Sequence, residues 1–308
     1  MTEDFSGQDL SGHDFSGVTL TDCRFQGSIL RKADFTGACL QNCDFDRADL
    51  SGATLEETAF TDCRLAGVVA ADSVWRAATL LRVNLQGADF HNASVQETRM
   101  EGVDFTGARF NRAYFYRVAP GADFIDVEVD RMVCMECDFS GLTFTRTRGT
   151  LLLLKNCAIA GLSVKDCDLP QFCITRETDG RGTSFEMCRM PFAGFSGTKL
   201  AGAKFSDCDL SGAFFSGANL QASQLTRLTL KKAGCAGADF SGAVFQDADC
   251  HMADFSHARF AHARLERLDL TLADAHNTEF AEAQMRDCVL DGLRRTDEAR
   301  LRAERFGT

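Results

Sequence analysis

The sequence predicts an all-β repeat fold, in which short extended segments stack as the coils of a solenoid. Three observations predict it. An apolar residue recurs at every fifth position over most of the chain, and a small residue lies two places before it. Glycine and polar residues fill the other positions. Helices and strands have sequence periods of about 3.6 and 2, so neither produces this pattern, whereas a short extended step followed by a corner does.

The five-residue period continues through three blocks, each of which keeps one register. The blocks run from Phe5 to Phe115, from Phe124 to Ile174 and from Phe185 to Leu290. They contain 56 repeats, and Gly149 is the one apolar position that a core former does not occupy. We expect register breaks near residues 116–123 and 175–184. We also expect one repeat domain over residues 1–292 and a separate tail over residues 293–308.

The repeat units resemble those of pentapeptide-repeat proteins over residues 3–290, with segments such as Ala33-Asp34-Phe35-Thr36-Gly37. The resemblance implies a right-handed quadrilateral parallel β-helix with four units per coil, hence about 14 coils from the 56 repeats. One internal feature agrees with four units per coil: Cys23, Cys43 and Cys63 recur every twenty residues.

The 14 cysteines mostly occupy inward positions, nine at the small site and three at the large site. Buried free thiols act as small hydrophobic residues, so we expect neither disulfides nor a metal site from them, and a reducing compartment. The chain starts without a secretory pattern, and its longest aliphatic run, Leu151–Leu154, is too short to cross a bilayer. The expectation is a cytoplasmic protein, bacterial by resemblance, without membrane contact.

The net charge of −11 disfavours direct binding of nucleic acid. The resemblance offers another role for acidity, since some members of this family mimic duplex DNA, bind gyrase and protect it from quinolones. Here the acidic positions are patchy, because Asp4 and Asp44 share a stacked column with Arg24. A second column is more uniformly acidic: Asp209, Asp249 and Asp269.

No catalytic pattern is present. The sequence lacks a phosphate-binding GxxxxGK[ST] loop and a GxSxG nucleophile motif. None of the six histidines lies twenty residues from another, so no pair is expected to stack as metal ligands. We therefore predict a non-enzyme without cofactor or metal.

The first break in the pattern contains the chain's two tyrosines, Tyr114 and Tyr116, with Arg112 and Arg117 close in sequence. Tyrosine and arginine are preferred anchors of protein interfaces. The tyrosines either anchor a partner or cover the register slip between Phe115 and Phe124.

The second break is an outward apolar stripe in the middle block, with Val133, Leu153 and Cys173 spaced by twenty residues and Leu151 and Met135 beside them. Exposed apolar stripes bind partners or are covered. A loop over residues 175–183 either covers this one, or the stripe joins Tyr114 and Tyr116 in one docking face.

The third break is the tail, which reads as a short helix capped by Thr296. Its predicted contact residues are Leu293, Ala299, Ala303 and Phe306. We expect them to seal the open end of the solenoid, or to form the tail-to-tail homodimer that the resemblance implies.

The function predicted from these features is a rigid, non-enzymatic scaffold that binds a protein partner. The resemblance adds a bacterial secretion-system accessory or effector as one form of this role. The alternative is a DNA-mimic modulator of a type II topoisomerase such as gyrase.

Overall fold

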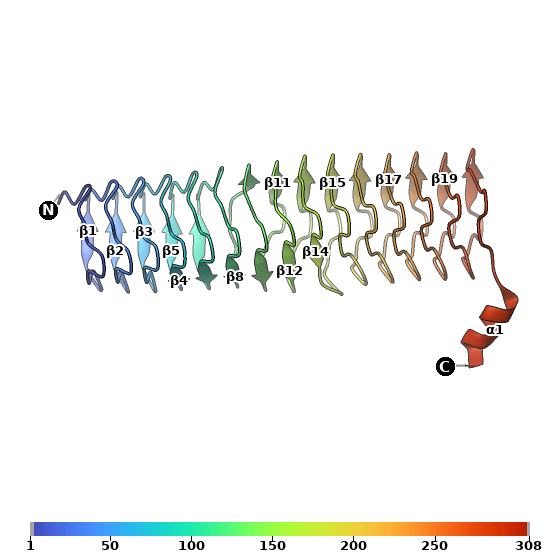
Figure 1. Ribbon diagram of the computed structural model, residues 1–308, viewed down its shortest axis with the longest axis horizontal. Coiled ribbons are helices and arrows are strands. Elements are labelled where there is room, and N and C mark those ends of the chain that lie inside the picture. Colours follow the sequence, from blue (N-terminus) through green and yellow to red (C-terminus); the bar gives the residue numbers. More distant parts are fainter. Residues whose placement is uncertain (1–2, 307–308) are drawn as a thin grey trace. The chain divides into compact units, whose positions relative to one another are not determined.

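The computed structural model describes residues 3–306, with side chains as far as Glu304. The chain divides into two units, Met1–Ala158 and Ile159–Thr308. It winds as a parallel β-solenoid of about 13 turns and ends in one short helix, α1 (Glu298–Phe306) (Figure 1). The predicted all-β solenoid with a C-terminal helix is confirmed.

In the first unit, each turn pairs with the next through parallel backbone contacts. Residues twenty apart bridge on four successive sides, as in Asp4 with Arg24 and Asp9 with Ile29. Four five-residue sides therefore make one turn. Its strands are β1 (Thr19–Thr21), β2 (Cys39–Gln41), β3 (Ala59–Thr61), β4 (Val74–Arg76), β5 (Thr79–Leu81), β6 (Ser94–Gln96), β7 (Arg99–Glu101), β8 (Tyr114–Tyr116), β9 (Phe124–Ile125), β10 (Val133–Met135), β11 (Thr143–Thr145) and β12 (Leu153–Lys155).

The second unit repeats the same construction. Strand β13 pairs with β15, and β15 to β20 then pair in chain order, all parallel. Its strands are β13 (Ser163–Lys165), β14 (Cys173–Ile174), β15 (Ser184–Glu186), β16 (Lys204–Ser206), β17 (Gln224–Thr226), β18 (Val244–Gln246), β19 (Arg264–Glu266) and β20 (Gln284–Arg286).

The large inward residues stack between turns. The rings of Phe25 and Phe45 lie 4.5 Å apart, and those of Phe195 and Phe215 lie 4.9 Å apart. Each buried side chain of this size contributes about 1.5–3 kcal/mol, so the column stabilises each turn on its neighbours.

The small inward site takes mostly alanine, cysteine, serine or threonine, and the polar ones among these can bond to the backbone inside the core. The Cys63 thiol donates to the Leu40 carbonyl at 3.4 Å, and the Thr58 hydroxyl donates to the Phe35 carbonyl at 2.8 Å. Most polar side chains at this site thus satisfy their own polar group inside the core, whereas the hydroxyls of Thr178 and Ser223 have no partner among the described residues.

The outward aspartates shape the corners. The carboxylate of Asp34 accepts the Thr36 backbone N–H at 2.9 Å, and that of Asp209 accepts the Ser211 N–H at 3.0 Å. Such Asx turns favour the corner conformation. Many of the aspartates are therefore structural and say little about function.

The register breaks are local changes in the length of one side. The first lies after the buried Pro120: Arg99 bridges Ala119 at a spacing of twenty, whereas Tyr114 pairs with Val133 at nineteen. In the second, Thr178 and Gly180 point inward and the Gly180 N–H bonds the Lys199 carbonyl at 2.8 Å. Residues 175–183 therefore continue the solenoid and do not form a covering loop.

Gly149 occupies its inward position because no larger residue fits there. Its φ of 150° lies outside the range of ordinary residues, and an added Cβ would lie 2.6 Å from the backbone nitrogen of Asp130. The apolar pattern is interrupted at Gly149 because the backbone of the preceding turn lies too close for any side chain.

Neighbouring phenylalanines in one turn provide a test of the inward ladder. We expect Phe215→Ala, which removes a buried ring, to lower the free energy of unfolding by about 3–5 kcal/mol. Phe214→Ala removes an exposed ring and should change it by less than about 0.5 kcal/mol. Urea denaturation measures both, and equal losses would contradict the assigned register.

Candidate functional site

The structure brings the predicted tyrosines and the first part of the apolar stripe together in the first unit. In register, Tyr114 pairs with Val133, and Val133 with Leu153. In the parallel column on the other side of the inward residues, Tyr116 pairs with Met135. We call this surface the tyrosine face: Tyr114, Tyr116, Val133, Met135, Leu151 and Leu153.

The two tyrosines are held in fixed positions. Their rings are nearly parallel, with centroids 6.4 Å apart, and the Tyr114 hydroxyl donates to the Met135 sulfur at 3.5 Å. Arg117 lies over the Tyr116 ring, 4.8 Å from its centroid, and pairs with Glu136 at 2.8 Å. Burial raises the pKa of Tyr114, with smaller effects from Tyr116 and other neighbours, so the phenol is neutral at physiological pH.

The remaining predicted residues lie at the edge of this face. Arg112 and Leu151 occupy corners with φ of 60°, and both are exposed. Cys173 belongs to the second unit, where it bridges Gly194 and is half-buried. All seven predicted partner-binding residues therefore lie in the first unit, either on one side of its turns or at one of the two corners that border this side.

The second unit carries an apolar surface that the sequence reasoning missed. Phe192 and Phe214 are exposed by 59% and 51%. An added Cβ on Gly212 would lie 2.7 Å from the Phe192 ring, so that ring lies directly over the glycine. Gly194 and Gly234 bridge Phe214 on either side. The available signal was a phenylalanine at an outward or corner position, where the repeat favours polar residues.

The tail helix differs from the prediction in both its cap and its position. Asp297 is the N-cap, since its carboxylate accepts the Ala299 and Arg300 N–H groups at 2.8 and 3.1 Å. The Thr296 hydroxyl instead accepts the Asn277 N–H at 3.2 Å. Ala303, like Ala299, is exposed.

The last turn stays open. Its inward residues Met285 and Leu290 are exposed by 40% and 37%, so the described part of the tail does not seal it. Leu293 is half-buried beside Phe280, while the side chain of Phe306 lies outside the described residues.

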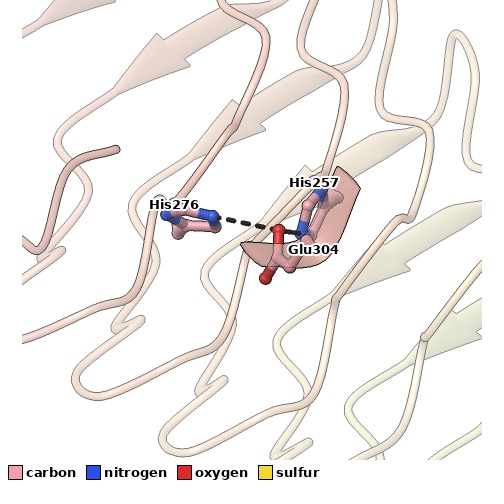
Figure 2. A group of neighbouring side chains, drawn as sticks. All are labelled: His257, His276 and Glu304. Carbon is pink, nitrogen blue, oxygen red and sulfur yellow. Dashed lines mark hydrogen bonds and ion pairs between the residues drawn. The ribbon is translucent and has the colours of Figure 1, made fainter. Parts of the chain in front are cut away.

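The helix is held against the side of the last turns by two histidines and one carboxylate (Figure 2). Nε2 of His257 and Nε2 of His276 each lie 3.2 Å from the same oxygen, Oε2 of Glu304. The other oxygen accepts the Arg300 side chain at 2.9 Å, and Arg300 also reaches Asp274 at 3.2 Å. We call His257, His276 and Glu304 the histidine latch.

The histidines meet although they are nineteen residues apart. The corner N–H of His257 bonds the carbonyl of His276 at 2.8 Å, because a left-handed corner residue pairs with the residue before its equivalent in the next turn. Two histidines nineteen residues apart at a corner would have been the sequence signal for this contact. Glu304 comes from the tail, and no repeat rule places it.

The latch has the composition of a divalent metal site, but its hydrogen bonds favour another role. His276 is buried, with 1% of its surface exposed. Its Nδ1 accepts the backbone N–H of Asp297 at 3.0 Å. The neutral ring therefore carries its proton on Nε2, the atom that a metal would need, and donates it to Glu304. The Asn277 side-chain amide lies 3.0 Å from Nδ1 of His257, where it can donate in the same way.

The carboxylate of the latch is ionised. Burial alone would raise the pKa of Glu304, but hydrogen bonds from Arg300 and His276 outweigh it and lower the pKa below its usual value. A carboxyl whose pKa is lowered by folding stabilises the attached helix at neutral pH, and this contribution is lost as the pH falls through the lowered value.

The thiols of the described interior fall into two groups. Hydrogen bonds from neighbouring thiols lower the pKa of Cys43, Cys137 and Cys188. Desolvation raises the pKa of the thiols of Cys134, Cys235 and Cys250, which are therefore protonated at neutral pH. Two apolar cavities in the second unit each measure about 10 Å³, enough for one water at most.

Sequence families agree with this architecture. The model of the pentapeptide repeat region matches residues 13–90. A second family model, pentapeptide repeats in eight copies, matches residues 76–118, 188–227, 223–260 and 253–292. The chain belongs to the pentapeptide repeat family.

Solved structures of the same family are similar to this chain. HetL, involved in heterocyst differentiation regulation in the cyanobacterium Nostoc sp. strain PCC 7120, is 23% identical with a TM-score of 0.30, over 75% of this chain and 86% of HetL. QnrB1, a plasmid-mediated fluoroquinolone resistance protein, is 15% identical with a TM-score of 0.34, over 100% of this chain and 97% of QnrB1. A pentapeptide repeat protein of the Arabidopsis thaliana thylakoid lumen is 39% identical with a TM-score of 0.17, over 35% of this chain and 68% of its own. No curated protein matches the sequence.

The described residues include no helix with the length and apolar character needed to cross a membrane.

The histidine latch predicts how the tail responds to mutation. Glu304→Ala removes the acceptor of both histidines, and we expect α1 to detach more often and trypsin to cleave after Arg300 several-fold faster. Glu298→Ala, an exposed change in the same helix, is the control and should leave the rate nearly unchanged. Equal cleavage rates in the two variants would show that the latch does not hold the helix.

Proposed function

We propose that this protein is a non-enzymatic scaffold whose tyrosine face binds a protein partner. The observation that carries the proposal is the in-register stack of Tyr114, Val133 and Leu153 beside Tyr116 and Met135 on neighbouring strands. A repeat that mostly places polar residues outward here presents a contiguous apolar and aromatic surface.

The composition of this surface supports a protein interface. Interface cores are enriched in tyrosine, methionine and arginine, and all three occur here within three adjacent turns. Because each tyrosine is already ordered by stacking, by the Met135 contact or by Arg117, little side-chain entropy is lost on binding.

The absence of an identified reactive centre among the described residues is consistent with a binding role. The fully buried thiols of Cys134 and Cys250 are protonated, and the two histidines of the latch are occupied in holding a helix. No feature of the described residues favours a secretion-system role in particular.

Topoisomerase modulation is the second candidate, supported by the acidic column that the structure forms from Asp209, Asp249 and Asp269. Two observations weaken it. Thr229 interrupts this column, and Asp249 pairs with Lys231 at 3.1 Å. In the first unit, Asp4 and Asp44 alternate with arginines in one column.

We also propose that the scaffold forms a homodimer, which the exposed Met285 and Leu290 of the last turn support. We expect sedimentation of the chain to show a dimer that Leu290→Asp dissociates; a monomer at all concentrations would contradict this contact.

Affinity capture from a bacterial lysate tests the proposed face. We expect the wild type to enrich a partner that Tyr116→Ala loses by roughly tenfold or more, because an ordered tyrosine ring is the kind of anchor that carries much of the binding energy of an interface. Leu153→Asp should reduce capture of the partner in the same way, because it places a charge within the tyrosine face.

Phe214→Ala, which removes an exposed ring from the other unit, is the matched control and should retain the partner. Equal capture by wild type, Tyr116→Ala and Leu153→Asp would reject the face. Enrichment of gyrase subunits that persists in both variants would favour the topoisomerase alternative.

A further inference from the structure

The tyrosine face has cationic side chains at both of its edges, although the chain as a whole is acidic. Arg112 and Arg131 lie exposed at one corner, and Lys155 lies exposed at the end of β12. Arg117 completes the rim beside Tyr116.

Three of these cations are open to a partner. Among the described residues, Arg112 and Lys155 form no ion pair within 4 Å, and the nearest carboxylate to Arg131 is that of Asp130, at 4.0 Å. Arg117 is different, since it pairs with Glu136 at 2.8 Å and with Glu97 at 3.5 Å.

The carboxylates of this region are already engaged. Asp130 accepts the backbone N–H of Thr150 at 3.1 Å and also its hydroxyl, both at Oδ1. Its single negative charge can offset only one of the two arginines beside it. Hydrogen bonds from Thr150 lower the pKa of Asp130, with the two arginines as smaller causes. A negatively charged partner thus meets uncompensated cations around an apolar centre.

The backbone restricts how a partner can bind. The N–H and C=O groups of β10 are used in ladders with β8 and β12, so an incoming strand has no edge to extend here. Contact must therefore be made between side chains. The three strands span about 10 Å, which is the length of about two helical turns.

Resting on the proposed function, we infer that the tyrosine face binds an acidic amphipathic helix of a partner protein. Apolar residues on one face of that helix contact Tyr114, Tyr116 and Met135. Its glutamates or aspartates flank them and reach the cations at the two edges.

Two labelled helical peptides test this inference by fluorescence anisotropy. One presents leucine on one face and glutamate on the other, and its twin has lysine in place of each glutamate. We expect the glutamate peptide to bind the full chain saturably and the lysine twin to bind at least roughly tenfold more weakly.

Variants locate the peptide on the chain. Tyr116→Ala should weaken the glutamate peptide by roughly tenfold. The double variant Arg112→Gln/Lys155→Gln should weaken it about threefold to tenfold and reduce its salt dependence. Phe214→Ala and Lys232→Gln remove an exposed ring and an exposed cation from the second unit and should leave binding unchanged.

Each outcome decides the inference. No binding of the glutamate peptide to the wild type, or equal loss in the control variants, overturns it. Tighter binding of the lysine twin that depends on Tyr116 overturns the acidic partner but supports the docking face of the proposed function. Binding of a labelled oligo-dT strand, lost in the same variants, would instead assign the face to a nucleic acid.

Discussion

The parallel backbone ladder between residues twenty apart is the constraint on which the rest of each unit depends. It places every fifth side chain over its equivalent in the next turn, as in Phe195 over Phe215. Since each turn is stabilised by its neighbours, any change in side length is confined to one place. The buried Pro120 and the inward Gly180 mark the two places where the ladder absorbs a missing or an added residue.

This constraint separates stability from function. Inward positions are restricted to core residues and corners to the left-handed conformation, so the outward positions are free to vary. Where they depart from the aspartate-rich pattern, they form surfaces that a polar solenoid does not need. The tyrosine face is one, and the exposed rings of Phe192 and Phe214 form another. Fold alone assigns neither to a partner, and the chemistry of the residues must do so.

The sequence was sufficient to predict the fold and the inward residues, because the five-residue period reports burial directly. It also predicted that Tyr114, Val133 and Leu153 share one side. It could not explain Gly149, which is required because the backbone at Asp130 in the neighbouring turn leaves no room for a side chain. The histidine latch was missed because corners pair at nineteen and because Glu304 arrives from the tail. The tail was expected to seal the last turn, yet electrostatic contacts hold it at the side.

The central claim is that the partner binds the tyrosine face, and hydroxyl-radical footprinting tests it most directly. Tyrosine and methionine side chains react readily, so the chain is oxidised alone and in complex with the protein that it captures. The account predicts protection of Tyr116 and Met135, with Met252 and Phe214 in the second unit unchanged. Protection of Met252 or Phe214 with Tyr116 and Met135 still fully reactive would contradict it.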